Sequence, residues 1–189
     1  MTQHAHETSD GSRAGSRNGF IRDARADDLP ALHAINEAST PGVGRVDQAA
    51  MEQLFAWASI TLVLEAPAPD DGVESALLKP GAFIMVMEDG SPYDGANYRW
   101  IAARYPRFAY CDRIAVSPGL RGQQAGARLY VAAIAQLQGR KPVLTCEVNT
   151  LPPNPGSMRF HTRLGFEEIG SQTFVPGEKA VAYLALDLS

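Results

Sequence analysis

The chain has 189 residues, a length that fits one domain and is short for two. Its hydrophobic content of 45% and charged content of 20% are typical of a globular protein. A formal net charge of −4 argues against nucleic acid or an anionic membrane as a partner. No apolar run approaches the roughly 20 residues of a membrane-spanning helix. We therefore expect a soluble, cytoplasmic protein.

The first residues differ in composition from the rest. Residues 1–19 are rich in Ser, Gly, His and Arg and show no apolar periodicity, which predicts a disordered tail ahead of a single domain over 20–189. The polar start does not resemble a signal peptide. The two cysteines, Cys111 and Cys146, each fall in a predicted strand and are interpreted as buried, reduced thiols. No His or Cys cluster has ligand spacing, so no metal site is predicted.

Apolar periodicity predicts a mixed succession of strands and helices. Strands are expected at residues 20–22, 61–65, 83–87, 108–116, 143–149, 166–174 and 181–188. Helices are expected from Asp27 or Asp28 (as cap) to Ser39, at 47–58, from 126 onward, and at 155–164. Turn-rich connections cover residues 66–80 and 88–100.

Two of the predicted strands carry polar side chains among apolar ones. Alternation in strand 108–116 places Tyr110, Asp112, Ile114 and Val116 on one face. Strand 143–149 has Leu144, Cys146 and Val148 on an apolar face and Thr145, Glu147 and Asn149 on a polar one. A polar face inside a sheet indicates a cavity, a helix end or solvent, and a cavity would make Glu147 a candidate for chemistry.

The stretch from Asp112 to Leu129 is the one around which the chain is organised. An apolar strand ends at Pro118, a loop holds Gly122, and a helix follows from about Gly126. Such a loop presents unpaired N–H groups and the positive end of a helix dipole, which together bind phosphate.

This stretch is similar to the acetyl-CoA-binding loop of the GNAT superfamily of N-acyltransferases, V-x-P-x-x-R-G-x-G-x-G-x-x-L. The matching residues are Val116, Pro118, Arg121, Gly122, Gly126 and Leu129. Gln124 stands at the middle glycine; if that position needs a positive φ, a residue other than glycine costs about 1 kcal/mol there. The backbone N–H survives the substitution, so we expect a weaker site and not a lost one.

A second stretch resembles another GNAT signature, N-x-x-[AS]-x-x-[LF]-[YH]-x-x-x-G-F. The matching residues are Asn154, Ser157, Phe160, Gly165 and Phe166, with His161 where tyrosine is commonest. The two motifs together imply the α/β (α+β) GNAT acyl-CoA N-acyltransferase fold, a mixed sheet of about six to seven strands flanked by four helices.

The resemblance also implies acetyl-CoA as co-substrate, with no metal. The residues it assigns to acetyl-CoA are Ile114, Ala115, Val116, Arg121, Gly122, Gln123, Gln124, Ala125, Gly126, Ala127, Asn154, Ser157 and Phe160. Self-association is common in the family, so a homodimer stays open.

Acyl transfer to an amine needs a base and an acid. Asp112 and Glu147 compete as base, directly or through water, and the alternative for Asp112 is a structural ion pair with Arg113 or with a loop arginine. His161 aligns with the tyrosine that serves relatives as acid, and the alternative is a satisfied core histidine.

Candidates for acceptor binding are aromatic. Tyr93, Tyr98 and Trp100 lie in the insertion 88–100, interpreted either as a binding lid or as a loop that its aromatics pin to the body, and Tyr110 lies on the strand after it. In the resembled family the segment joining the first two helices lines the acceptor pocket, so 41–45 is either a substrate loop or a plain turn.

The leading hypothesis is an N-acetyltransferase that acts on a primary amine of a small molecule by direct attack in a ternary complex. The alternative is a catalytically silent acyl-CoA-binding module on the same fold, which Gln124 favours.

Overall fold

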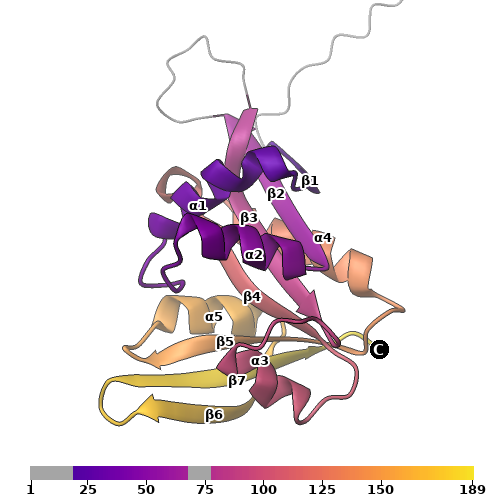
Figure 1. The fold of residues 1–189 in the computed structure, drawn as a ribbon, viewed down its shortest axis with the longest axis vertical. Helices are drawn as coiled ribbons and strands as arrows, with labels where there is room; N and C mark the ends of the chain where they lie inside the picture. The colour runs from indigo at the N-terminus through magenta and orange to yellow at the C-terminus, as the bar shows by residue number, and fades with distance from the viewer. Residues whose placement is uncertain (1–18, 68–77) are drawn as a thin grey trace, which may run out of the picture.

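The computed structural model describes residues 19–67 and 78–189 (Figure 1). One mixed sheet has the strand order β1-β2-β3-β4-β5-β7-β6. The strands are β1 (Phe20–Asp23), β2 (Ile60–Pro67), β3 (Leu78–Glu88), β4 (Ala109–Val116), β5 (Val143–Leu151), β6 (Glu167–Val175) and β7 (Lys179–Asp187). The helices are α1 (Leu29–Glu37), α2 (Gln48–Trp57), α3 (Ala96–Ala102), α4 (Ala125–Leu137) and α5 (Pro155–Arg163), with 3-10 turns η1 (Ala26–Asp28) and η2 (Pro118–Leu120).

The predicted fold class is confirmed, with one more helix than expected. The connection 88–100, predicted to be irregular, forms α3 at its end, so five helices and not four flank the seven strands of the described chain. Seven residues are too few to show a helical apolar period, and the glycines and proline before them favoured a loop. The predicted tail up to residue 18 and residues 68–77 of the first connection lie outside the described residues.

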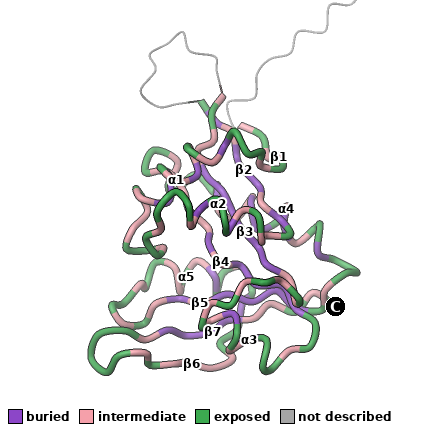
Figure 2. The backbone as a smooth tube through the Cα atoms, viewed as in Figure 1, coloured by how far each residue is buried: buried purple, intermediate pink, exposed green. Residues whose placement is uncertain are grey.

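Helices cover both faces of the sheet, as the buried central strands in Figure 2 indicate. On one face, buried residues of α4 such as Leu129 and Ala133 pack against β2, β3 and β4, with α5 beside them over β5. On the other face, α1, α2 and α3 contribute Leu32, Met51 and Ile101 to a second core. We call these the α4 face and the α1 face. No helix of the described ranges is long and apolar enough to cross a bilayer.

The sheet divides between β4 and β5. These two strands are parallel, and their pairing consists of Ala109 with Leu144 and Tyr110 with Thr145. Beyond these pairs β4 follows its antiparallel partner β3 up to Val116, while β5 follows β7. Because each strand stays with its own partner, the two halves of the sheet separate after Tyr110 and Thr145 (Figure 1).

A β-bulge corrects the predicted faces of β4. Met85 of β3 pairs with Arg113 and Val86 pairs with Cys111, so Asp112 has no opposite residue. One extra residue reverses the alternation at that point. Tyr110 therefore faces the α1 side whereas Ile114 packs on the α4 side, and the prediction that they share a face is wrong.

The helix caps are confirmed for α5 and corrected for α1. Asn154 accepts a hydrogen bond from the backbone N–H of Ser157 at 3.1 Å, and Gly165 follows α5 with φ +91°. Asp28 makes no capping bond to α1; its carboxylate accepts instead from the backbone N–H of Arg25 and from the Arg22 guanidinium. Burial beside an arginine on β1 gave this carboxylate a stronger partner than the helix amides.

Candidate active site

A slot opens where β4 and β5 separate. Its volume is about 310 Å³, which suits a small ligand. The side chains around it come from both faces of the sheet. The lining residues are Pro41, Gly42, Val43, Gly44, Tyr93, Asn97, Cys111, Asp112, Arg113, Ile114, Tyr130, Cys146, Glu147, Val148, Asn149, Asn154, Ser157, His161, Lys179 and Val181. The slot therefore passes through the sheet, with the carboxylates toward the α1 face and the histidine toward the α4 face.

The environment of the slot shifts the pKa of Glu147 to a value that suits proton transfer. Burial raises the pKa of its carboxyl to about 7, the Tyr110 hydrogen bond opposes that rise, and the charge of Asp112 adds to it. The Tyr110 hydroxyl donates to Glu147 Oε2 at 2.6 Å, and the Asn97 side chain also hydrogen-bonds the carboxylate. A carboxylate with a pKa near neutrality is suited to accept a proton and release it again.

Asp112 is held on both carboxylate oxygens. Its Oδ1 accepts from the Tyr93 hydroxyl at 2.6 Å, and its Oδ2 accepts from Arg113 Nε at 2.8 Å. Burial and the charge of Asp112 raise the pKa of Tyr93, so this phenol stays protonated and donates. The ion pair with Arg113 that we considered for Asp112 is present. Glu147 has no such ion pair among the described residues, so it is the better candidate of the two carboxylates to exchange a proton.

His161 lies across the slot on α5 and is only 4% exposed. Its Nδ1 lies 2.8 Å from the Ser157 carbonyl oxygen, which can only accept, so Nδ1 carries the proton. Nε2 then accepts from the Tyr130 hydroxyl at 2.9 Å. Burial lowers the pKa of His161, so the ring is neutral at neutral pH. Both ring nitrogens are satisfied, and Tyr130, whose hydroxyl is bound to Nε2, also lines the slot.

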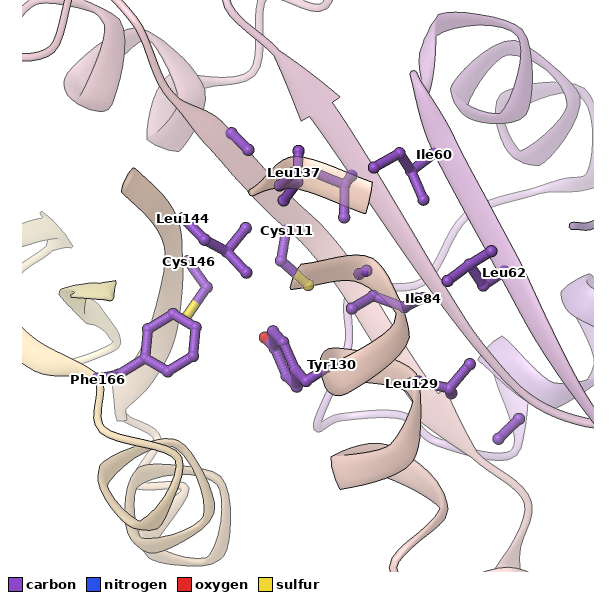
Figure 3. Packing of buried hydrophobic residues seen from close by; sticks show 14 of the residues in the cluster. Ile60, Leu62, Ile84, Cys111, Leu129, Tyr130, Leu137, Leu144, Cys146 and Phe166 are labelled. Carbon is purple, nitrogen blue, oxygen red and sulfur yellow. The ribbon is translucent and has the colours of Figure 1, made fainter. Parts of the chain in front are cut away.

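The two cysteines flank this hydroxyl. Figure 3 shows Tyr130 of α4 with its oxygen directed to the space between Cys111 on β4 and Cys146 on β5. Burial raises the pKa of Cys111 to about 12 and that of Cys146 well above its usual value. The prediction of buried, unbridged thiols is confirmed. A nucleophilic thiolate is disfavoured at either position.

The loop before α4 has the geometry that an anion needs. Gln124 has φ +61° and ψ +11°, the left-handed conformation that was expected to cost a non-glycine residue energy. The amides of the first turn of α4 have no acceptor within the helix and point out of its N-terminus. A side chain at Gly126 would meet the Phe160 ring at 3.1 Å, so the glycine permits α4 and α5 to approach.

A second hollow of about 530 Å³ adjoins this loop. It is bordered by Gly122, Gln123, Gln124 and Ala125 together with Arg128 and residues of β2 and η2. Loop amides, an open volume and a helix N-terminus form a donor set that fits a diphosphate. The Arg121 guanidinium is turned away, donating to the carbonyls of Val116 at 3.2 Å and Ala38 at 3.1 Å.

The structure places the side chains predicted from sequence in three groups: around the slot, beside the second hollow, or away from both. Seven of them line the slot: Tyr93, Asp112, Ile114, Glu147, Asn154, Ser157 and His161. Those that border neither hollow are Tyr98, Trp100, Tyr110, Ala115, Val116, Arg121, Gly126, Ala127 and Phe160. Asn97 and Tyr130 line the slot and were missed. The inward helical position of Tyr130 was readable from its neighbour Leu129, but its contact with His161 was not.

Two aromatic residues of the insertion attach α3 to the body. The Tyr98 hydroxyl donates to the Glu88 carbonyl at 2.8 Å. Trp100 stacks on Tyr183 with centroids 3.9 Å apart, and the Arg104 guanidinium lies 3.5 Å from the Trp100 ring. These contacts match the alternative of a loop pinned by its aromatics. In the described chain no group of three His, Cys, Asp or Glu is placed to hold a metal ion.

The mixed α/β sheet, the slot and the amide-rich loop before α4 are features that the resemblance to an acyltransferase family led us to expect, and a comparison with known families identifies the class. The family described as the Acetyltransferase (GNAT) family matches residues 45–166, more than half of the chain. The chain belongs to the GNAT acetyltransferase family. No curated protein matches it.

Solved structures show the same fold at low sequence identity. The ribosomal-protein-S18-alanine N-acetyltransferase of Escherichia coli is 19% identical with a TM-score of 0.65, over 90% of this chain and 94% of that one. Ard1 of Thermoplasma volcanium is 15% identical with a TM-score of 0.70, over 91% and 99%. Arabidopsis thaliana NAA60 in complex with acetyl-CoA is 13% identical with a TM-score of 0.66, over 89% and 98%.

The left-handed conformation of Gln124 generates a stability prediction. Gln124→Val should lower the free energy of unfolding by about 1–2 kcal/mol, because a β-branched residue is poorly tolerated at positive φ. Gln124→Gly should leave it unchanged or raise it by up to about 1 kcal/mol. Urea unfolding measures both, with Gln123→Val as the control at a neighbour without positive φ. Equal stability of the Val and Gly variants would contradict a left-handed loop.

Proposed function

We propose that this protein transfers the acetyl group of acetyl-CoA to a primary amine of a small molecule, by direct attack in a ternary complex. The observation that carries the proposal is a half-buried carboxylate, Glu147, with a pKa of about 7, in a slot that crosses the sheet beside the amide-rich start of α4. The cytoplasmic location and the homodimer considered from the sequence stay predictions.

Acetyl-CoA fits the residues on the α4 side. The amides between Gln124 and Ala127 would hold the diphosphate, and the edge of β4 that leaves β5 would face the pantetheine arm at Ile114. Acetyl-CoA supplies the acetyl group as a thioester. The small volume of the slot, about 310 Å³, supports a small acceptor, which would enter from the α1 face.

Glu147 would accept the proton of the attacking amine. A protonated amine has a pKa near 10 and cannot attack, so a base must take its proton before or during transfer. The Tyr110 and Asn97 contacts orient the carboxylate; burial raises its pKa to near neutrality, and the like charge of Asp112 adds to that rise. We assign Asp112 this electrostatic role and Glu147 the role of base.

Tyr130 and His161 would serve the departing thiolate as a pair. The neutral His161 holds the Tyr130 hydroxyl in the slot through its Nε2. Turned from His161, that hydroxyl would donate a hydrogen bond to the developing negative charge on sulfur. His161 would therefore act through Tyr130. The Tyr130 hydroxyl would do the work of the tyrosine that the family motif commonly has at the position of His161.

The proposed activity is tested by release of CoA from acetyl-CoA in the presence of a panel of amines. The panel contains spermidine, phenethylamine, free amino acids and a peptide that begins with alanine, since the Escherichia coli neighbour is an S18-alanine acetyltransferase. We expect release above background with at least one small amine. Calorimetric binding of acetyl-CoA without any turnover would instead support a silent acyl-CoA-binding module, and no binding would refute both.

The pKa of Glu147 predicts the pH dependence of kcat/KM. Below pH 7 the carboxyl is protonated and cannot accept a proton, so the rate should rise with pH through about 7. Glu147→Gln should remove this ionisation. Asp112→Asn should shift it to lower pH, because a like charge that raises the pKa is lost. Profiles that both variants leave unchanged would exclude either carboxylate as base.

Loss of the Tyr130–His161 pair should affect turnover more than acetyl-CoA binding. We expect His161→Phe and Tyr130→Phe each to lower kcat by roughly 10- to 100-fold with little change in the KM for acetyl-CoA. The double variant should be about as slow as the slower single one, since the two residues act as a unit. Steady-state kinetics measures this. Additive losses, or an unchanged kcat in His161→Phe, would refute the pairing.

A further inference from the structure

A buried arginine joins the slot to the connection between α1 and α2. Arg113 is 9% exposed and Asn36 is fully buried. Besides its ion pair with Asp112, Arg113 donates through Nη1 to Asn36 Oδ1 at 2.8 Å and to the Gly44 carbonyl at 3.3 Å. Asn36 Nδ2 donates to the same carbonyl at 3.1 Å. We call Arg113, Asn36 and the Gly44 carbonyl the Arg113 clamp.

The clamp fixes a segment that borders the slot. Residues 41–44 contribute four consecutive lining positions on the α1 face. Two side chains converge on the Gly44 carbonyl, and His33 Nε2 donates to the next carbonyl but one, that of Val46, at 2.9 Å. Backbone carbonyls in irregular segments usually bond to water, so two buried donors on the Gly44 carbonyl and a half-buried one on the Val46 carbonyl indicate a segment held in one conformation.

The same arginine orients the carboxylates. Its Nε holds Asp112 Oδ2, whose partner oxygen accepts from Tyr93, and the charge of Asp112 acts on Glu147. The bulge makes this possible: by inserting Asp112 it turns Arg113 to the α1 face, opposite Met85 and toward α1. One guanidinium thus fixes both the carboxylate side and the segment 41–44.

We propose that the Arg113 clamp is the positioning device of the acceptor site, so that acceptor binding depends on it and acetyl-CoA binding does not. This inference rests on the proposed function and extends it. The segment 41–44 would form the acceptor wall at a fixed distance from Glu147. The planar fork of arginine is needed because one side chain must reach Asp112, Asn36 and Gly44 at the same time. Lysine carries the charge but not the fork.

Two variants test the clamp without changing the charge of the slot. Arg113→Lys keeps the cation and loses the fork, and Asn36→Leu removes the amide at similar volume. Arg140→Lys is the matched control, because Arg140 also pairs with a carboxylate, Glu88 at 2.8 Å, but is 55% exposed and borders neither hollow. Thermal unfolding establishes that each variant is folded. If Arg113→Lys does not fold, the result for Asn36→Leu alone tests the clamp.

The readouts are amide hydrogen exchange of residues 42–46, the KM for the panel amine with the fastest turnover, and the Kd of acetyl-CoA. We expect exchange and amine KM to rise about tenfold or more in both variants, with the acetyl-CoA Kd within about twofold and Arg140→Lys like wild type. Unchanged exchange would overturn the clamp. Faster exchange with an unchanged amine KM, or an equal rise in the acetyl-CoA Kd, would overturn its positioning role. No turnover by the wild type would refute the proposed function itself.

Discussion

The divergence of β4 from β5 is the constraint on which the site depends. Both strands are buried and parallel, yet they pair through two residues each, because β4 stays hydrogen-bonded to β3 and β5 to β7 along their lengths. The buried Thr145 hydroxyl, which donates to the Ala109 carbonyl at 2.9 Å, reinforces the point of separation. Backbone edges that would otherwise complete a sheet are thereby left facing a slot.

The proposed base and the proposed acid lie on opposite faces of the sheet, on either side of the slot. Glu147, Asp112 and Arg113 belong to the α1 side, whereas Tyr130 and His161 belong to the α4 side. A base and an acid in direct contact would exchange a proton with each other and shift each other's pKa. Placed on opposite sides of the opening, each keeps the protonation state that its own burial and partners impose.

Local sequence signals predicted the elements and much of the site, and long-range contacts account for the rest. The strand, loop and helix around Gln124 and the cap at Asn154 were readable because each depends on neighbours in the chain. The bulge at Asp112 was not, since it exists only in the register with β3. The contact of Tyr130 with His161 joins residues 31 apart, and that of Arg113 with Asn36 joins residues 77 apart. No periodicity in the chain encodes such pairings.

The two buried sulfurs offer a native reporter of how firmly the sheet is closed. Cys111 and Cys146 are the only cysteines of the chain, and each immediately follows the last residue of its strand that takes part in the parallel pairing. Their thiols are almost fully buried and protonated, yet both border the slot, so alkylation should be slow and should report on access to the slot at this seam. The rate of iodoacetamide labelling in the folded protein therefore reads out the state of the slot with no probe introduced.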